Sequence, residues 1–411
     1  MPPNAEAFIR KHLRFNFIIG MFDGGFFGFG VGFASFAAVI PLFVHHLTDS
    51  ALLVGLVPAV HNIGWQLPQL LTAGWMSGMK RYKPLVLLMT IHERVPYLGL
   101  AIVAFISPQV TKEVALALTF MMLVWQGFGA GLAANPWTSM VSKVMPVELH
   151  GTFFGTQSAA YNGMAGLSAI LAGLILDKVA GPLNFSLCFA LTFLWMAVSF
   201  VFLSQTREPE SQPKEREQVS AFLKKSLAIL RSDPNFRMFL FVRVLSQFAG
   251  MAFSFYIIYA VGRFGMSDAA ASILVSLLLI GQIVLSPLMG RWGDHWSHRG
   301  VMALGALGAS LSAFLAWFAS SSEWFYAIFL LQAVATVAIW TIPLAFSVSF
   351  AEKPEDRPIY IGLANTIPAP ATILAPVIGG WIADASGFHL MFILSAACGL
   401  LMAAALLKMK D

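Results

Sequence analysis

The sequence predicts an all-α membrane protein in which twelve transmembrane helices form two pseudo-symmetric six-helix bundles. Of its 411 residues, 58% are hydrophobic and only 11% are charged, whereas soluble domains carry about 25% charged residues. Apolar runs such as 51–71 and 301–318 are much longer than the alternating segments of about ten residues that build transmembrane barrels. The basic residues also gather between alternate runs, as they do in the cytoplasmic loops of membrane proteins.

Twelve apolar runs follow one another along the chain, and each is long enough for a spanning helix of about 20 residues. The first run begins near Leu13 and is too long for a signal-peptide core, so it should remain as the first span. Cys188 and Cys398 lie inside such runs, and neither a disulfide nor a metal framework is expected. The predicted spans are 13–44, 51–76, 84–106, 114–141, 151–177, 183–204, 236–261, 268–290, 300–319, 323–350, 358–384 and 388–408.

Lysine and arginine are distributed unevenly between the two sides of these spans. With the N-terminus in the cytoplasm, twenty of the 25 basic residues lie on the cytoplasmic side, and only Lys112, Lys178 and Arg263 lie outside. The remaining two, Arg94 and Arg243, fall within spans. This asymmetry predicts that both termini are cytoplasmic, and the expected location is the plasma (inner) membrane.

One long polar stretch, from about Gln205 to Asn235, follows the sixth span. It predicts an N-terminal bundle over 1–204, a cytoplasmic linker over 205–235 and a C-terminal bundle over 236–411. Apolar residues within the linker recur at helical spacing beside lysines, which indicates an amphipathic helix at an anionic membrane surface or, alternatively, a partner-binding helix. These apolar residues are Val219, Phe222, Leu223, Leu227 and Leu230.

The two halves of the chain resemble each other. At an offset of 207 residues, glycine and acidic positions of the fifth span align with those of the eleventh, and at an offset of 216 residues the loop after span two aligns with the loop after span eight. Parallel six-span repeats predict a pseudo-two-fold axis along the membrane normal and a central cavity between the halves.

The loop after span eight, GRWGDHWSHR over 290–299, carries the most specific motif. It resembles the loop motif of the major facilitator superfamily, and the likeness to that family covers nearly the whole chain. In the family this loop braces the cytoplasmic ends of neighbouring helices, so the resemblance implies a cytoplasmic latch made by Gly290, Arg291, Asp294 and Arg299. The first-half copy, 74–83, has Gly78 where an aspartate is expected, so a charge-based latch is predicted for the second half.

Another segment, 375–384, resembles the family's eleventh span, where small residues let helices approach closely. Two departures separate the chain from the proton-linked drug antiporters of the family. Leu123 stands where those proteins place an arginine three residues before a Gln-Gly pair, and Ala169-Ile170 stands in place of their Gly-Pro pair. The resemblance therefore favours the superfamily more strongly than that subfamily.

Four ionisable side chains lie about 9 to 11 residues inside their spans, near the membrane midplane: Asp23, His61, Glu93 and Arg94. Such groups are unfavourable in a membrane and are functional candidates by default. Asp23 is the first candidate for proton coupling because the family places the first helix along the cavity; alternatively, it is a structural carboxylate held by Arg94. Glu93 and Arg94 project about 100° apart, and the peripheral third helix of the family favours a structural ion pair. His61 is either a titrating group or a hydrogen-bonded packing residue.

Arg243 and Gln247 lie one helical turn apart on the seventh span, which lines the cavity in the family. Arg243 could therefore meet an anionic group of a substrate; alternatively, it snorkels to the cytoplasmic surface. Further candidates for the cavity wall, each with helix packing as the alternative, are Phe27, Trp125, Gln126, Tyr256, Tyr259, Gln332 and Trp340.

These features predict a secondary transporter that moves a small organic solute by alternating access, with protons as the candidate coupling ion. The alternatives are a proton-linked multidrug efflux pump and, from another class, a non-transporting receptor or enzyme on the same fold, which should carry an appended domain or a catalytic cluster. No phosphate-binding glycine loop is present, so ATP-driven transport is disfavoured. A monomer in the lipid bilayer, without cofactor, metal, nucleic-acid partner or enzymatic activity, is expected. The sequence leaves open whether the substrate is a cation or an anion, because it does not tell which buried charges are already paired.

Overall fold

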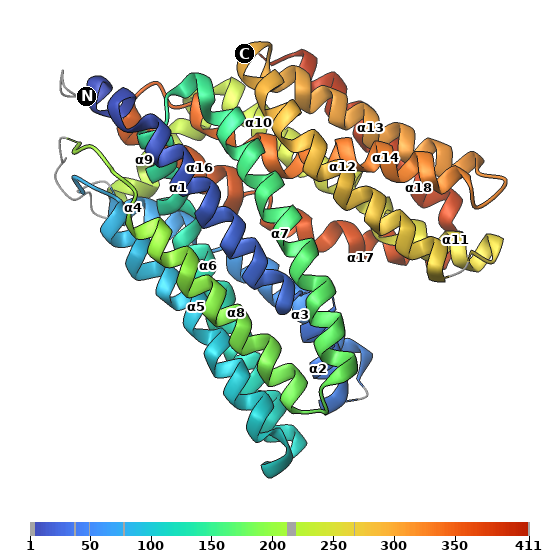
Figure 1. Cartoon of the computed structure of the whole chain (residues 1–411). Helices are drawn as coiled ribbons and strands as arrows, with labels where there is room; N and C mark the ends of the chain where they lie inside the picture. The colour runs from blue at the N-terminus through green and yellow to red at the C-terminus, as the bar shows by residue number, and fades with distance from the viewer. Residues whose placement is uncertain are drawn as a thin grey trace. The chain divides into compact units, whose positions relative to one another are not determined.

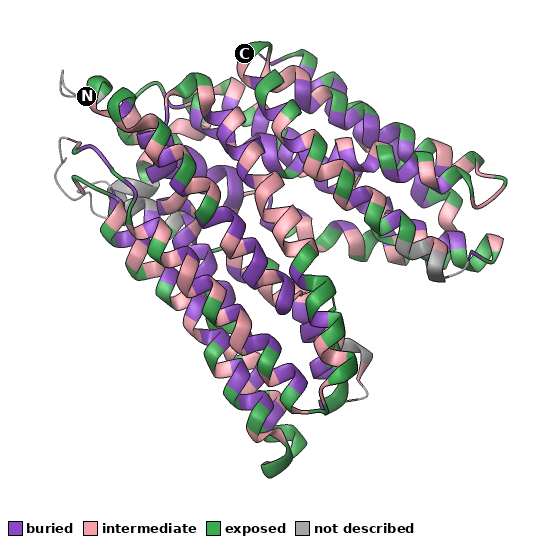
Figure 2. Ribbon diagram, viewed as in Figure 1, coloured by how far each residue is buried: buried purple, intermediate pink, exposed green. Residues whose placement is uncertain are grey.

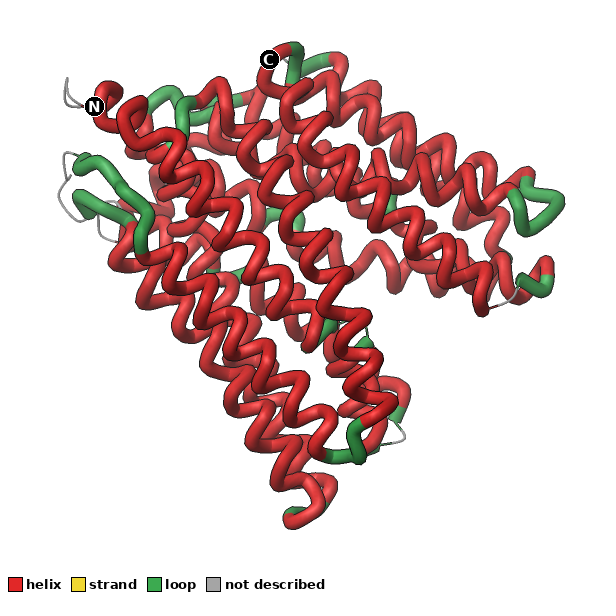
Figure 3. Tube along the Cα trace, in the orientation of Figure 1, coloured by secondary structure: helices red, strands yellow, loops and turns green. Residues whose placement is uncertain are grey.

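The computed structural model describes residues 5–36, 38–48, 50–76, 79–211, 219–266 and 268–409. Within these ranges the regular structure is helical throughout, as the tube in Figure 3 shows. Ser77 and Gly78 of the first-half loop motif lie outside the described residues.

The helices are numbered in chain order, and Figure 1 labels most of them. Those before the linker are α1 (Ala5–Phe33), α2 (Val39–Leu47), α3 (Ala51–Gln66), α4 (Gln69–Met76), α5 (Lys83–Ile106), α6 (Lys112–Val144), α7 (His150–Lys178) and α8 (Leu183–Ser204). The later ones are α9 (Val219–Ser232), α10 (Pro234–Ala249), α11 (Tyr256–Phe264), α12 (Asp268–His295), α13 (His298–Phe318), α14 (Trp324–Thr336), α15 (Ile342–Ser349), α16 (Arg357–Thr366), α17 (Ala369–Ser386) and α18 (Phe388–Leu407).

Eleven helical segments in the described part of the chain are long and apolar enough to cross a membrane. The remaining predicted span, 51–76, is divided at Leu67 and Pro68 into α3 and α4, and each piece is shorter than a spanning helix. Proline breaks the helix here because it has no backbone N–H to donate. With the α3–α4 pair counted as one span, the chain has the predicted twelve-helix architecture.

Other predicted spans are also interrupted. The first one bends after Phe33 and continues as α2, the seventh is divided by a 3₁₀ segment after Gly250, and the eleventh is divided at Ile367 and Pro368. The tenth contains a π-helical turn, Val337–Thr341, between α14 and α15. Interrupted helices and π turns expose backbone groups and are frequent at the binding sites of membrane transporters.

Contacts between residues divide the chain into two compact units. The first consists of residues 1–146, 160–218 and 354–362, and the second of residues 147–159, 219–353 and 363–411. Each unit is described by itself below.

In the first unit, α1 packs on α8, α5 packs between α6 and α8, and α3 packs on α6. Phe43, Tyr97 and Phe189 are fully buried in its core. On α1, a Cβ at Gly28 would lie only 2.3 Å from the backbone oxygen of Tyr161, so glycine is required where α1 meets α7. Figure 2 shows buried and exposed residues alternating around these helices, as expected when one side faces protein and the other faces lipid.

In the second unit, α13 packs on α14 and α18, while α10 packs on α18 and α12 on α14. The first turns of α7 pack against α12, where a Cβ at Gly290 would lie 2.1 Å from the Gly151 oxygen. The predicted linker contains a helix, α9, and Leu227 on it is exposed. Val219, Phe222 and Leu223 belong to α9, but their side chains lie outside the described part of the structure.

Candidate functional site

A buried carboxylate and a buried guanidinium meet inside the first unit. Asp23 on α1 and Arg94 on α5 are 6% and 5% exposed, and Nη2 of Arg94 lies 4.0 Å from Oδ1 of Asp23. Ser199 on α8 bridges them, because its hydroxyl accepts from Arg94 Nη2 at 3.1 Å and donates to Asp23 Oδ1 at 2.7 Å. The structure thus brings together two residues that lie on different predicted spans.

Glu93 approaches the same guanidinium, with its Oε2 3.6 Å from Nη1 of Arg94. Glu93 and Arg94 project in different directions from α5, yet the Arg94 side chain is long enough to approach the carboxylates of both Asp23 and Glu93. The guanidinium also donates to the backbone oxygens of Met196 at 3.1 Å and Thr90 at 3.2 Å, and it lies 5.3 Å above the ring of Phe27. These contacts hold Arg94 between two carboxylates, in what we call the Asp23–Arg94–Glu93 cluster.

Three residues around this cluster were not identified from the sequence. Besides Ser199, the side chain of Trp137 on α6 hydrogen-bonds the Asp23 carboxylate, and the fully buried Tyr97 hydroxyl has no partner among the described residues. A single serine or tryptophan in an apolar run gives no signal of its own. Glu93 and Tyr97, however, are four residues apart and share a helix face, a spacing that would have marked Tyr97 as a neighbour of the carboxylate.

A second polar pair joins α3 and α6. Nδ1 of His61 lies 2.9 Å from Oε1 of Gln126, and the His61 ring stacks on Phe36 with the ring centroids 4.0 Å apart. Trp125 points elsewhere, because it is 38% exposed and donates from Nε1 to His92 Nδ1 on α5 at 3.2 Å. The structure therefore brings together His61 and Gln126 and separates Trp125 from them.

Arg243 on α10 is a buried cation of a different kind. It is 6% exposed, its Nη1 donates to the backbone oxygen of Ile339 at 2.7 Å, and its Nε has no hydrogen-bond partner among the described residues. No carboxylate of the described residues lies within ion-pair distance of Arg243. Because the side chain is buried, it does not snorkel to a surface. Ile339 belongs to the π-helical turn, so the guanidinium binds a carbonyl at an irregular point of the tenth span.

Gln247, one turn after Arg243, is also buried, and its Oε1 accepts from the Thr372 hydroxyl on α17 at 3.3 Å. Gln332 on α14 is 4% exposed, whereas Trp340 in the π-helical turn is 42% exposed. Tyr256 and Tyr259 lie in the aromatic core of the second unit, with rings 5.8 and 5.1 Å from that of Phe392. These two tyrosines therefore pack inside the second unit, although the sequence predicted them as part of a cavity wall.

The predicted latch lies within the second unit. Asp294 near the end of α12 accepts from the backbone N–H groups of Gly151 at 2.7 Å and Thr152 at 2.5 Å, in the first turn of α7. His298 Nε2 lies 3.5 Å from the same carboxylate. Arg291 and Arg299, which the sequence predicted as partners, are not among these contacts, and Arg299 donates instead to the backbone oxygen of Met409. The carboxylate thus caps a helix rather than pairing with arginines.

A related arrangement occurs in the first unit, where Glu208 follows α8. Its two carboxylate oxygens accept from the backbone N–H groups of Tyr82 at 2.7 Å and Lys83 at 2.8 Å, at the start of α5, and Lys143 Nζ binds it at 2.8 Å. Burial, and to a lesser extent the Glu208 charge, raise the pKa of the Tyr82 hydroxyl to about 12. The tyrosine therefore remains neutral at physiological pH.

Comparison with known proteins identifies the family of this chain. The sequence profile of the Major Facilitator Superfamily matches residues 95–267 and, in a second match, 239–411. Multidrug resistance protein 1 of Bacillus subtilis (strain 168) is 28% identical over 138 residues, which cover 34% of this chain and 35% of that protein. The chain thus matches about a third of that relative's length.

Two solved structures share the fold over nearly the whole chain. The E. coli fucose:proton symporter FucP has a TM-score of 0.76 at 14% identity, over 96% of this chain and 98% of that one. The proton:xylose symporter XylE, bound to 6-bromo-6-deoxy-D-glucose, has a TM-score of 0.73 at 17% identity, over 97% and 96%. Because the profile matches more than half of the sequence and the twelve-helix fold is shared, the chain belongs to the Major Facilitator Superfamily of secondary transporters.

Proposed function

We propose that this protein is a secondary transporter that moves a small organic anion by alternating access and couples that movement to protons. One observation carries the proposal: the two arginines buried within spans differ in their partners. Arg94 lies against two carboxylates, whereas Arg243 has none among the described residues. The first arrangement is suited to exchanging a proton, and the second to binding an anion.

Charge balance in the Asp23–Arg94–Glu93 cluster supports proton coupling. Two ionised carboxylates beside one guanidinium leave an excess negative charge, and one bound proton makes the cluster neutral. Unbalanced charge is unfavourable inside a membrane, so proton occupancy can be linked to a conformational equilibrium. FucP and XylE, which share the fold, are both described as proton symporters.

Arg243 supports the choice of an anion. A buried guanidinium without a counter-charge is disfavoured by several kcal/mol, and a carboxylate or phosphate on a ligand would offset that penalty. The buried Gln247 donates to the Arg243 backbone oxygen at 3.4 Å and accepts from the half-buried Thr372 hydroxyl, so the two residues offer further hydrogen-bonding groups. A cationic substrate would instead need an unpaired carboxylate, and Asp23 and Glu93 both lie against Arg94.

The test begins with purified full-length protein in detergent and a thermal-shift screen of organic acids, each with its uncharged amide and its amine analogue. A ligand that binds the folded state raises its apparent stability, and we expect acids to do so. The best acid then serves as a labelled probe in proteoliposomes. Asp23→Asn should abolish accumulation driven by a pH gradient while leaving exchange of the probe largely intact, because exchange needs no net proton release.

Arg243→Gln should abolish both binding and exchange of the acid. Arg263→Gln, which removes an exposed cation from α11, is the matched control and should transport normally. Stabilisation by amines in place of acids would refute the anionic substrate. Gradient-driven accumulation that persists in Asp23→Asn at the wild-type rate would remove Asp23 from the mechanism and direct attention to Glu93 and His61.

Proton-linked multidrug efflux is the second candidate, supported by the partial match to Multidrug resistance protein 1. It predicts stabilisation by lipophilic cations of unrelated structure, so the same screen separates it from the first proposal. A non-transporting receptor would bind a ligand without accumulating it. We further propose that the protein acts as a monomer in the plasma membrane with both termini in the cytoplasm, as the distribution of its basic residues indicates.

A further inference from the structure

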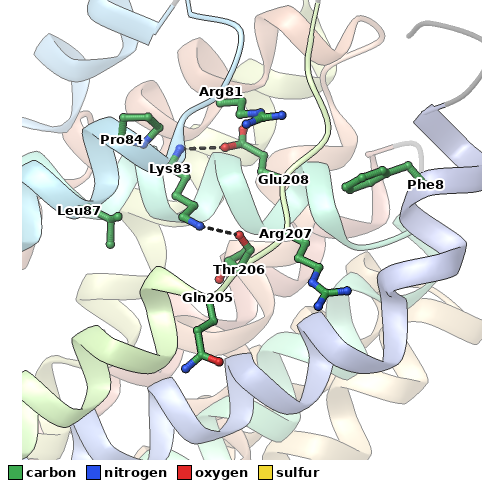
Figure 4. Close-up of a pocket in the computed structure, with 9 residues that line it drawn as sticks. All are labelled: Phe8, Arg81, Lys83, Pro84, Leu87, Gln205, Thr206, Arg207 and Glu208. Atoms are coloured by element: carbon green, nitrogen blue, oxygen red, sulfur yellow. Dashed lines mark hydrogen bonds between the residues drawn. The ribbon is translucent and has the colours of Figure 1, made fainter.

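A second polar site lies in the first unit, away from the charge cluster, where the segment after α8 crosses the start of α5. Residues 205–208 of this segment, together with Phe8, Arg81, Lys83, Pro84 and Leu87, line a pocket of about 450 Å³. Figure 4 shows these side chains from α1, the start of α5 and the segment after α8 around one opening. Neither the transport proposal nor the latch uses this pocket.

The pocket is positively charged. Arg81, Lys83 and Arg207 contribute three cations, and Glu208 contributes the single anion of the lining. The Glu208 carboxylate is already committed, because its oxygens accept from two backbone N–H groups and bind the Lys143 ammonium at 2.8 Å. Its charge is therefore balanced by a residue outside the lining, and the cations of the lining remain in excess.

These cations are positioned and keep donors to spare. Lys83 Nζ donates to the Thr206 backbone oxygen at 3.0 Å, as the dashed line in Figure 4 shows, and can donate two further hydrogen bonds. The Arg207 guanidinium lies 4.3 Å from the ring of Phe15. Arg81 pairs with Glu210 at 3.4 Å, and both side chains are more than half exposed. Exposed pairs of this kind are weak, so a stronger anion can compete for Arg81.

Gln205 and Thr206 add uncharged polar groups to the lining, and Phe8, Pro84 and Leu87 form its apolar part. Farther along α5, Leu88 and Ile91 are 52% and 42% exposed. Because α5 spans the membrane, its exposed apolar side chains face lipid. The site thus combines a cationic end with an apolar path along a spanning helix.

We propose that this pocket binds the phosphate headgroup of an anionic phospholipid, with an acyl chain along Leu88 and Ile91 of α5. Arginine and lysine are the preferred donors to phosphate oxygens, and the excess of cations selects a lipid with net negative charge over a zwitterionic one. A free inorganic phosphate would satisfy the cations equally well. The apolar path along α5 is what favours the lipid.

Native mass spectrometry of the full-length protein in detergent tests this, with phosphatidylglycerol, phosphatidylcholine and inorganic phosphate as probes. We expect phosphatidylglycerol to be retained at least fivefold more than phosphatidylcholine. Arg207→Gln and Arg81→Gln, each an exposed residue, should each weaken that retention about fivefold, the effect of one basic group near an anionic lipid. Lys112→Gln, an exposed cation at the start of α6, is the matched control and should leave it unchanged.

The variant Arg207→Lys keeps the positive charge and should restore the retention of phosphatidylglycerol. It therefore shows whether the loss in Arg207→Gln comes from the missing charge or from a less stable protein. Equal retention of the two lipids by the wild-type protein would overturn the proposal, as would unchanged retention in both glutamine variants. Competition by millimolar inorganic phosphate with no retained lipid would identify a free-phosphate site and would equally refute the lipid assignment.

Discussion

At the scale of single residues, the partners of a buried arginine determine what it can do. Arg94 and Arg243 are almost equally buried, yet Arg94 is held by Asp23, Glu93 and Ser199, whereas Arg243 binds a single described carbonyl, that of Ile339. Removing one partner of a buried ion pair leaves the other uncompensated in a medium of low dielectric constant. A buried cation without a counter-charge already carries that penalty and gains stability when an anion arrives.

This difference predicts opposite responses to mutation. Arg94→Ala leaves two carboxylates uncompensated and should destabilise the protein by about 3 to 5 kcal/mol. The double variant Arg94→Ala/Asp23→Asn removes one of those charges and should be more stable than Arg94→Ala alone. Thermal unfolding in detergent of the wild type, both single variants and the double variant measures this. If the double variant is no more stable than Arg94→Ala, the two side chains do not form a coupled pair.

The sequence predicted the depth of these residues but not their pairing. Asp23, Glu93 and Arg94 stand out because charges are rare in apolar runs, and their position within a run gives their distance from the membrane surface. Whether a guanidinium meets a carboxylate depends on which spans pack side by side and how they are rotated. Ser199, which lies between Asp23 and Arg94, is one serine in an apolar run and carries no such signal.

At the scale of helices and loops, two carboxylates act on the first turns of spanning helices. The first N–H groups of a helix have no acceptor within the helix, and an anion there is favoured by hydrogen bonding and by the helix dipole. Asp294 satisfies Gly151 and Thr152 of α7, and Glu208 satisfies Tyr82 and Lys83 at the start of α5. The Asp294 contact ties the end of α12 to α7, and the Glu208 contact ties the segment after α8 to α5, each within its own unit.

Asp294→Asn should therefore weaken the contact between α12 and α7, because it removes the charge and presents an amide to two N–H groups. We expect a shift in the conformational equilibrium of about 1 to 3 kcal/mol. The reaction rate of a cysteine introduced at Thr156 on α7, in a Cys188→Ser/Cys398→Ser background, measures it and should rise at least fivefold. Arg291→Ala, which removes a cation that does not contact Asp294, should leave that rate unchanged. An equal effect of both substitutions would restore the arginine-based latch.

The spans themselves follow from the sequence, whereas their interruptions do not. Apolar runs give the number and order of the spans because each must be long enough to cross the bilayer. The breaks at Pro68 and Pro368 lie inside runs that remain apolar, and proline within a membrane helix produces either a kink or a break, depending on what packs beside it. The π-helical turn over 337–341 precedes Pro343, which has no N–H to donate to the Ile339 oxygen four residues earlier. A proline by itself does not tell a π turn from a kink.

At the scale of the whole molecule, the internal repeat predicts more symmetry than the residues sustain. The loop after span eight uses Asp294 as a helix cap, whereas Gly78 stands at the matching position after span two. In the first unit a carboxylate from the segment after α8, Glu208, caps a spanning helix instead. A repeat can thus keep its fold while the carboxylates that cap its helices come from different segments. Because Glu208 does not lie at the position that matches Asp294, comparing the two halves of the sequence does not point to it.

The orientation of the whole chain is the broadest prediction, because it decides which ends of the spans meet cytoplasmic protons and lipids. Twenty of the 25 basic residues fall on one side and three on the other, and the excess of lysine and arginine marks the cytoplasmic side. A cysteine replacing Lys112, the exposed first residue of α6, should react with a membrane-impermeant maleimide added to intact cells. A cysteine replacing the exposed Lys353, before α16, should react only after the membrane is permeabilised.

Cys188→Ser/Cys398→Ser provides the background, and a cysteine at the exposed Lys178 should behave as the one at Lys112 does. Labelling of positions 112 and 353 from the same side would overturn the twelve-span topology, and reaction of position 353 alone in intact cells would invert it and move the Glu208 and Asp294 helix caps to the outer face.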